Sequence, residues 1–166
     1  MGTNENLQEA FAGESQANRK YMAFAKKAET EGFPQIAKLF RAAAEAETVH
    51  AHNHLRVMGK IEETGENLKA AIEGEGFEFK EMYPKFIAEA ESEGNKGAVN
   101  TFKYANAVEE VHHTLYAEAL EKFQKGEDLP ALDIYVCGIC GYTVKDNPPD
   151  KCPVCGSARK VFYTVT

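Results

Sequence analysis

Hydrophobic residues recur at alternating steps of three and four along most of the chain, which is the spacing of one face of an α-helix. Glycine and proline, which end helices, divide this pattern into four stretches. We expect Asn67 to cap the third helix and Pro84 to kink it, because proline lacks a backbone N–H. The pattern predicts an all-α four-helix bundle. Its helices run from Leu7 to Ala28, from Ile36 to Val57, from Asn67 to Phe86 and from Ala98 to Phe123.

Each predicted helix carries a carboxylate on its apolar face. These residues are Glu14, Glu47, Glu75 or Glu78, and Glu109. A buried, unpaired carboxylate costs several kcal/mol, so it must be protonated, paired or bound to a cation. The same faces carry few lysines or arginines, which leaves a metal ion as the expected partner.

Two histidines on the same faces strengthen the prediction of a metal site. His50 follows Glu47 by three residues, and His112 follows Glu109 by three. Residues at this spacing share one face of a helix, so each pair can bind the same metal. A glutamate from each of two helices, together with Glu-x-x-His from two others, is the ligand set of a carboxylate-bridged di-iron bundle.

The predicted bundle contains an internal repeat with a period of 62 residues. Each half is therefore expected to be one helical hairpin that supplies half of the metal site. At a shift of 62 residues, Glu14 aligns with the position after Glu75. The third helix is therefore displaced by one residue relative to the repeat. Glu78 matches Gln16, so the second half has an extra carboxylate that should make the two metal positions unequal. Matched pairs are Tyr21 and Tyr83, Phe24 and Phe86, Phe40 and Phe102, Glu47 and Glu109, and His50 and His112.

Other polar residues near the predicted ligands have two readings. Tyr21 and Tyr83 either pack in the core with satisfied hydroxyl groups or hydrogen-bond an oxygen species at the metals. His54 is expected to lie in the core or to support a ligand. His52 and His113 are expected to face outward.

The cysteines indicate a second, separate metal site. All of them lie near the C-terminus, as Cys137, Cys140, Cys152 and Cys155. Two C-x-x-C pairs, each followed by glycine, predict tetrahedral four-thiolate ligation of iron or zinc. Because this segment is short and has little hydrophobic core, we expect the bound metal to stabilise its fold. We therefore expect a bundle domain at 1–128 and a metal-knuckle domain at 129–166.

Charge and hydropathy exclude several functions. Asp and Glu outnumber Lys and Arg by 26 to 19, giving a net charge of −7, which disfavours a nucleic-acid partner. No run approaches the roughly 18 apolar residues that a membrane span needs. The polar N-terminus has no apolar signal-peptide core, and paired cysteines suit a reducing compartment. We therefore expect a cytoplasmic location.

Taken in order, these motifs resemble the rubrerythrin family. The resemblance rests on the run 11–17, the two Glu-x-x-His motifs, Glu75-x-x-Glu78 before 81–84, and the cysteine pairs. It implies a ferritin-like di-iron bundle followed by a rubredoxin-like Fe(Cys)4 domain. It also places Tyr21 and Tyr83 beside the di-iron site, and implies that one iron moves between Glu78 and His50 with redox state. The implied di-iron ligands are Glu14, Glu47, His50, Glu75, Glu78, Glu109 and His112.

The resemblance also implies an activity. Members of the family are peroxidases that reduce hydrogen peroxide to water and protect against oxidative stress. Their electrons come from NAD(P)H through a separate reductase, often with a small rubredoxin between, and pass through the Fe(Cys)4 site. The residues leave open a ferroxidase or iron-handling protein, an O₂ reductase, and a non-redox protein with zinc at the cysteines.

The link between the second and third helices predicts a homodimer with exchanged helices. In a ferritin-like bundle this link, about 60–66, climbs back along the bundle by about 27 Å, on a helical rise of about 1.5 Å per residue. Seven or eight extended residues reach about 26 Å at most. We therefore expect the first two helices of one chain to complete a bundle with the last two of another.

Overall fold

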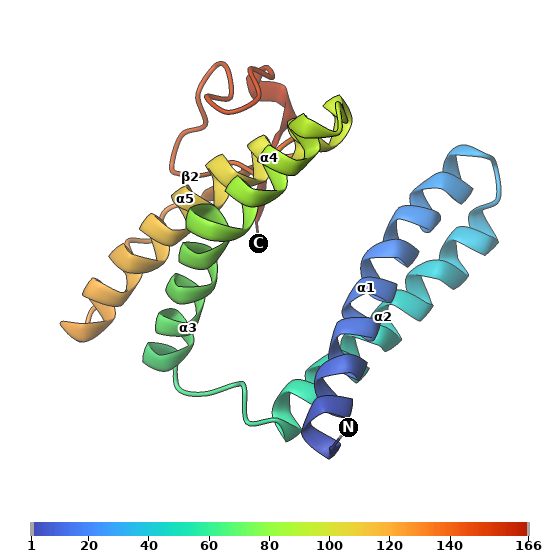
Figure 1. Cartoon of the computed structure of the whole chain (residues 1–166), viewed down its shortest axis with the longest axis horizontal. Coiled ribbons are helices and arrows are strands. Elements are labelled where there is room, and N and C mark those ends of the chain that lie inside the picture. The colour runs from blue at the N-terminus through green and yellow to red at the C-terminus, as the bar shows by residue number, and fades with distance from the viewer. Residues whose placement is uncertain (1, 166) are drawn as a thin grey trace. The chain divides into compact units, whose positions relative to one another are not determined.

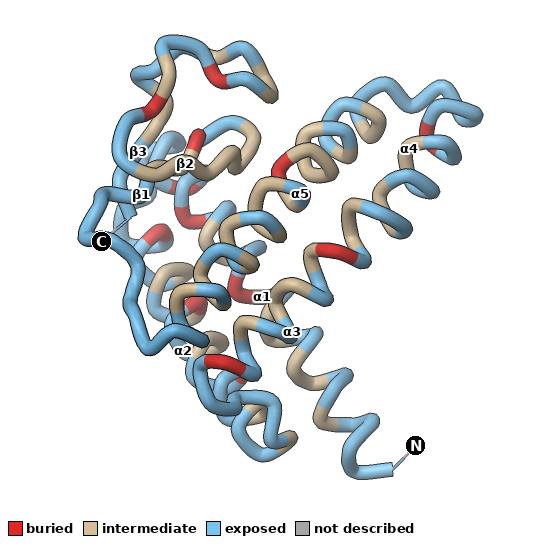
Figure 2. Tube along the Cα trace, turned by 90° about the vertical axis from the view of Figure 1, so that its left-hand side faces the viewer, coloured by how far each residue is buried: buried red, intermediate tan, exposed pale blue. Residues whose placement is uncertain are grey.

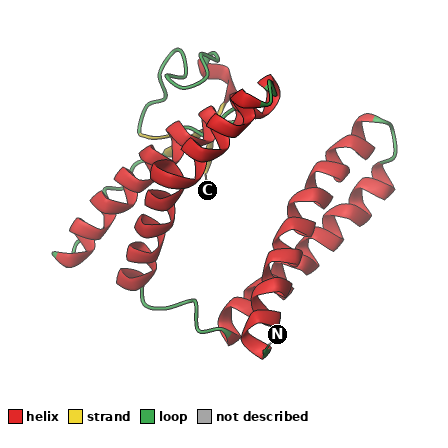
Figure 3. Cartoon of the chain, viewed as in Figure 1, coloured by secondary structure: helices red, strands yellow, loops and turns green. Residues whose placement is uncertain are grey.

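The computed structural model describes residues 2–165, and the chain forms two compact units that divide between Glu62 and Glu63. The first unit is a helical hairpin (Figure 1). The second combines helices with a small β-sheet, and a loop joins the two units (Figure 3). The elements of the first unit are α1 (Thr3–Thr30) and α2 (Pro34–Val57). Those of the second are α3 (Thr64–Phe77), η1 (Glu78–Met82), α4 (Tyr83–Ser92), α5 (Lys96–Gln124), β1 (Ile134–Cys137), β2 (Thr143–Lys145), η2 (Arg159–Val161) and β3 (Phe162–Val165).

The hairpin of α1 and α2 is held together by small side chains. Alanines are buried along its seam, and they appear as short red stretches in Figure 2. The turn between the helices passes through Gly32 at φ +84°, a conformation that glycine adopts without strain. Pro34 begins α2, where its missing N–H is not needed. The helix ends predicted from the glycine and proline positions are thus confirmed here. The buried alanines are Ala25, Ala28, Ala37, Ala44 and Ala51.

The third predicted helix differs from the prediction in two ways. It begins at Thr64 instead of Asn67, because the Glu63 carbonyl accepts the amides of Glu66 and Asn67 at 3.0 Å. The disturbance expected at Pro84 takes the form of a π-helical turn, η1, in which the Tyr83 amide bonds back to the Glu78 carbonyl. Pro84 then lies in the first turn of α4, where a missing N–H costs nothing.

The π-helical turn explains the one-residue slip in the internal repeat. A π-helical turn accommodates one residue more than an α-helical turn. Glu14 and Tyr21 are seven residues apart, whereas Glu75 and Tyr83 are eight apart. The extra residue is therefore absorbed in η1, and both the glutamate and the tyrosine keep their places on the inward face.

Aromatic packing confirms that the two halves repeat. In the first unit, the Phe24 and Phe40 rings lie 5.6 Å apart, with Tyr21 at 6.3 and 6.2 Å from them. The matched rings of the second unit show the same three distances. They are Tyr83–Phe86 at 6.3 Å, Tyr83–Phe102 at 6.2 Å and Phe86–Phe102 at 5.6 Å. Each unit is thus built on the same aromatic cluster.

The cysteine-bearing segment folds as a three-stranded antiparallel sheet in the order β2-β1-β3. Within the second unit, this sheet contacts α5 through β2. Lys145 of β2 pairs with Glu118 of α5, and Thr143 of β2 hydrogen-bonds His112 of α5. The boundary predicted between 128 and 129 falls in the stretch between α5 and β1, and it stays a prediction.

Within residues 2–165, no helix combines the length and the apolar character that crossing a bilayer requires.

Candidate metal centres

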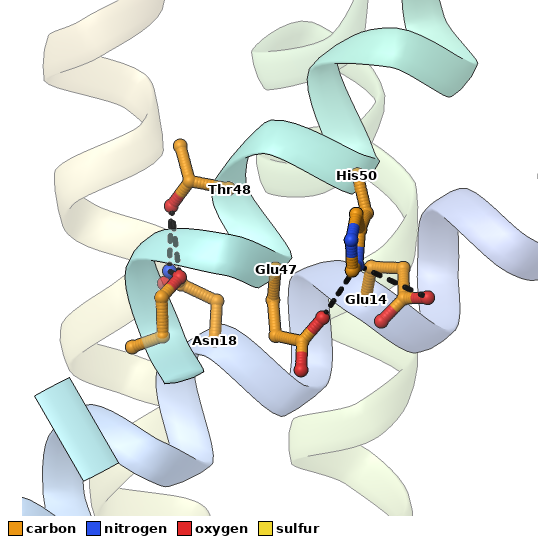
Figure 4. Close-up of polar contacts among 6 residues, drawn as sticks. Glu14, Asn18, Glu47, Thr48 and His50 are labelled. Atoms are coloured by element: carbon orange, nitrogen blue, oxygen red, sulfur yellow. Dashed lines mark hydrogen bonds and ion pairs between the residues drawn. The ribbon is translucent and has the colours of Figure 1, made fainter. Parts of the chain in front are cut away.

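The first group of candidate ligands joins the two helices of the hairpin. Glu14 comes from α1, and Glu47 and His50 come from α2. Nδ1 of His50 lies 2.8 Å from a carboxylate oxygen of Glu47 and 3.9 Å from one of Glu14 (Figure 4). One ligand atom from each of the three residues falls within 4.8 Å of the others. This is close enough for one metal ion to bind all three.

Asn18 holds the two helices in register at this level. It is buried, and its side-chain amide donates to the Ala44 carbonyl at 2.7 Å and to the Thr48 hydroxyl at 2.8 Å (Figure 4). It lies one turn from Glu14, and Thr48 directly follows Glu47. The sequence prediction did not assign it a role, although a buried asparagine on an apolar face was the signal for one.

The second group repeats the first inside the other unit. Glu75 comes from α3, and Glu109 and His112 come from α5. Nδ1 of His112 lies 2.8 Å from Glu109 and 3.7 Å from Glu75, and the ligand atoms again fall within 4.8 Å of one another. The side chains of Glu47 and Glu109 are both only 17% exposed. The residues predicted from the repeat thus form two matching groups, one in each unit.

The acids of the second unit crowd one another. Desolvation raises the pKa of Glu75, and the charge of Glu109 raises it further, although His112 opposes this. Burial and the charge of Glu75 likewise raise the pKa of Glu78, which lies on the π-helical turn η1 outside the three-residue group. A divalent cation would relieve this repulsion, and mixed carboxylate and imidazole donors are those of carboxylate-bridged iron pairs. The two Glu–His groups therefore suit a di-iron centre.

The two tyrosines occupy equivalent positions in the internal repeat. Desolvation and the negative charges of Glu78, Glu109 and Glu75 raise the pKa of Tyr83, so its hydroxyl stays protonated near the acids. Tyr21 packs against Phe24 and Phe40 in the first unit. Tyr83 therefore has the surroundings of a hydrogen-bond donor at the second group.

The remaining histidines differ from the prediction at one position. His52 is exposed, as expected, and His54 is half-buried. His113, however, does not face outward. Its ring packs edge-on against Phe79 with centroids 5.4 Å apart. It also lies beside Gly76, where the absence of a side chain provides space for the ring. It is a packing residue between α5 and the segment that carries the acids.

The four cysteines converge on one point. Sγ of Cys137 lies 3.7 Å from that of Cys155, Sγ of Cys140 lies 3.5 Å from that of Cys152, and all four are free thiols. The glycine after each pair has a positive φ, with Gly141 at +86° and Gly156 at +72°. Their amides close the turns by bonding to the Cys137 and Cys152 carbonyls at 2.9 Å.

Backbone amides stabilise negative charge on the sulfurs. Burial raises the pKa of Cys140, and the Tyr142 amide opposes this by donating to its sulfur. At Cys155, desolvation also raises the pKa, but hydrogen bonds from the Ser157 side chain and amide prevail and lower it to about 6. A metal bound by four thiolates needs such donors. The segment is a rubredoxin-like four-cysteine site.

Comparison with known proteins matches both parts of the chain. A family profile described as Rubrerythrin matches residues 5–120, and one described as Rubrerythrin, rubredoxin-like domain, matches residues 135–163. Rubrerythrin-2 of Clostridium acetobutylicum is 33% identical over 174 residues, which cover 96% of this chain and 95% of that protein. Nigerythrin of Nitratidesulfovibrio vulgaris is 37% identical over 174 residues, covering 96% of this chain and 85% of that one.

A solved structure is also similar. Nigerythrin in a partially reduced state aligns with a TM-score of 0.59 at 34% sequence identity. The alignment covers 99% of this chain and 88% of that one. The fold of this chain therefore has an experimental counterpart along nearly its full length.

Proposed function

Because the chain belongs to the rubrerythrin family, we propose that it is a non-haem di-iron peroxidase that reduces hydrogen peroxide to water. The observation that carries the proposal is the pair of matched groups, Glu14–Glu47–His50 and Glu75–Glu109–His112, in a chain that also holds a four-cysteine site. The proposed reductant is an NAD(P)H-dependent reductase, acting directly or through rubredoxin in the cytoplasm.

The metals and the protein have separate tasks in this proposal. Two ferrous ions, when bound, supply the two electrons that convert hydrogen peroxide and two protons into two water molecules. We propose that Glu47 and Glu109, together with Glu14, Glu75 and Glu78, would supply the carboxylate ligands of these ions. These acids balance the metal charge, and their partial burial limits competition from water. The hydroxyls of Tyr21 and Tyr83 would serve as hydrogen-bond donors to the substrate peroxide.

The cysteine domain is proposed to relay electrons to the bundle. A small, buried four-thiolate iron changes charge by one unit with little rearrangement, which suits it to electron transfer. A purely structural zinc would leave the cysteine site colourless, whereas ferric iron bound by four thiolates is red.

Rapid mixing of the fully reduced protein with peroxide tests the proposed reaction. We expect the iron pair to be oxidised faster by peroxide than by an equal concentration of O₂, with about one peroxide consumed per pair, since each iron gives up one electron. Absorbance in a stopped-flow instrument measures both rates.

This experiment, together with the addition of excess Fe²⁺, distinguishes the other candidate functions. Faster oxidation by O₂ would make the protein an O₂ reductase. Accumulation of ferric mineral on addition of excess Fe²⁺ would make it a ferroxidase or iron-storage protein. Either result would overturn the peroxidase proposal.

We further propose that a metal pair is completed only in a homodimer with exchanged units. Seven residues of α2 follow His50, and the first eleven residues of α3 precede Glu75. Bringing both groups to one level within a single chain requires the link to climb about 27 Å, at a rise of about 1.5 Å per residue. The seven steps from Val57 to Thr64 reach at most about 25 Å when fully extended.

The start of the link shortens its reach further. The amides of Met58, Gly59 and Lys60 bond back to carbonyls of α2, so these residues continue its last turn. Exposed apolar side chains on the hairpin also need a cover, because so large an apolar surface is unfavourable in water. They include Phe24, Phe33, Ile36, Leu39 and Val57. A second copy of this chain provides that cover through its own second unit.

Co-expression of two inactive variants tests the exchange. Glu47→Ala disables the first-unit group, and Glu109→Ala disables the second-unit group. With exchanged units, a mixed dimer contains one bundle with both defects and one intact bundle. We expect about a quarter of wild-type di-iron sites, because half of randomly assorted dimers are mixed and each has one intact site of two. Iron analysis and the peroxide reaction measure the recovery.

The control pairs Glu47→Ala with Glu14→Ala, two defects in the same unit, which should restore nothing. If the Glu47→Ala and Glu109→Ala mixture also restores nothing, each chain builds its own site and the exchanged dimer is wrong.

A further inference from the structure

A hydrogen bond connects the cysteine domain to a candidate ligand of the iron pair. Nε2 of His112, on α5, lies 2.9 Å from Oγ1 of Thr143, the first residue of β2. The other ring nitrogen, Nδ1, is the atom that faces Glu109 and Glu75. The imidazole thus has one nitrogen toward the acids and one toward the neighbouring domain.

The hydroxyl of Thr143 is set to accept from the imidazole. It donates its single proton to the Gly141 carbonyl at 3.0 Å, so toward His112 it acts as an acceptor. In the tautomer that this contact favours, Nε2 carries the proton and Nδ1 offers its lone pair. That lone pair and the carboxylate oxygens of Glu109 and Glu75 are all electron-pair donors without a proton between them. A cation would bind to all of them.

Thr143 is also tied to the cysteine site. It lies three residues after Cys140, and the intervening Tyr142 donates its amide to the Cys140 sulfur. Gly141, which accepts from Thr143, has its amide bonded to the Cys137 carbonyl. The position of the hydroxyl therefore depends on the same turn that positions two of the thiolates.

The surroundings favour this hydrogen bond. His112 and Thr143 both line a cavity of about 370 Å³ between the sheet and the helices, whose other walls are mainly apolar and include Leu115, Tyr116 and Val136. A hydrogen bond in surroundings of low polarity is stronger than the same bond in water. Lys145 and Glu118 hold β2 against α5 two residues from Thr143.

We propose that Thr143 is a positioning residue that orients His112 for metal binding and thereby couples the bundle site to the cysteine site. Ligating histidines normally donate the N–H of their second ring nitrogen to a neighbouring acceptor, which fixes the orientation of the ring. Here that acceptor belongs to the cysteine domain. Metal binding at the cysteines, by ordering the turn 140–143, strengthens metal binding at Glu75, Glu109 and His112, and the coupling is reciprocal.

The proposal is tested with Thr143→Val, which keeps the shape and the strand preference of threonine but removes the hydroxyl. Thr143→Ser restores the hydroxyl, and Thr164→Val changes an exposed threonine of strand β3, at the other edge of the same sheet, as a matched control. Full-length protein is used, with zinc at the cysteines confirmed by metal analysis and thermal unfolding compared among the variants.

Two readouts report on His112. In zinc-loaded protein labelled with ¹⁵N, the Nε2–H proton of His112 should be resolved and protected from solvent exchange in the wild type, and lost to rapid exchange in Thr143→Val. Co²⁺ titration of the bundle site should show an affinity about 10- to 100-fold lower in Thr143→Val, the usual cost of losing a group that holds a ligand. Thr143→Ser and Thr164→Val should resemble the wild type.

The proposed coupling between the two metal sites is tested by combining substitutions. Removing the metal site with Cys140→Ser should weaken Co²⁺ binding at the bundle in the wild-type background but add little in Thr143→Val, because the link is already cut. Equal affinities in Thr143→Val and wild type, or additive losses in the double variant, would overturn the proposal. The inference rests on the proposed function only in taking the Glu–His groups as metal sites. Neither readout uses peroxide, so a failed peroxide reaction leaves this test intact.

Discussion

Glu109→Ala is expected to abolish both iron binding at the pair and peroxide reduction. Glu109 is closer to His112 than Glu75 is, and its negative charge raises the pKa of Glu75. Glu109 is a proposed carboxylate ligand of the iron pair, so its loss would weaken iron binding at the pair. We expect a rate at least about 100-fold lower, because removing a group that merely orients a ligand already costs about 10- to 100-fold. Iron per chain and the stopped-flow rate with peroxide measure the two effects.

Glu110→Ala is the matched control for this prediction. Glu110 is the next residue of α5 and is exposed, so its loss changes the net charge equally without touching the group. Both iron content and rate should stay near those of the wild type. A Glu109→Ala protein that retains two bundle irons and its full rate would contradict the assignment of this residue.

The parts of the site that were predictable share one physical basis. An acid on an apolar helix face is costly without a partner, so Glu14, Glu47 and Glu109 stood out individually. The repeat then linked them to the histidines and to Tyr21 and Tyr83. The matched distances in the two units confirm that each half forms the same local structure, because periodicity and repeat matching both concern residues close in sequence.

Features that depend on contacts distant in sequence were not predicted. The repeat showed a slip at Glu75, but only the backbone showed that a π-helical turn absorbs it. His113 was expected outside because its packing partner, Phe79, lies on another helix. Thr143 carried no signal, since an isolated threonine in a strand is ordinary and its partner His112 is 31 residues away.

The predicted and the unpredicted features of the site differ in their physical origin. The candidate ligands follow from local pattern, whereas their surroundings depend on contacts that the fold supplies. Asn18 and Thr48 bond to each other across the two helices of the first unit, and Thr143 hydrogen-bonds His112 in the second. The two halves of the repeat are therefore alike in their acids and different in what holds them. This difference gives a structural reason for two metal positions with unequal properties, in addition to the extra acid Glu78.

Cys152→Ser is expected to stop reductase-driven turnover while sparing one round of peroxide reduction. Cys152 is buried, and its sulfur lies 3.5 Å from that of Cys140. Small metal domains draw about 10–16 kcal/mol of apparent free energy from their metal, more than so small a core supplies, so the domain should unfold when one thiolate is lost. The red colour should disappear with it.

The two activities separate the roles of the two sites. With iron at saturating concentration, to offset any weaker binding through Thr143, peroxide should still oxidise the reduced pair once in Cys152→Ser. Steady-state peroxide consumption with NAD(P)H and a reductase should fall at least about 100-fold, because losing the relay lengthens the path for electrons beyond direct reach. Lys151→Ala, at the exposed neighbour, is the control and should keep both activities. Unchanged steady-state turnover in Cys152→Ser would show that electrons enter the bundle without the cysteine domain, and would remove the relay from the mechanism while leaving the peroxide chemistry in place.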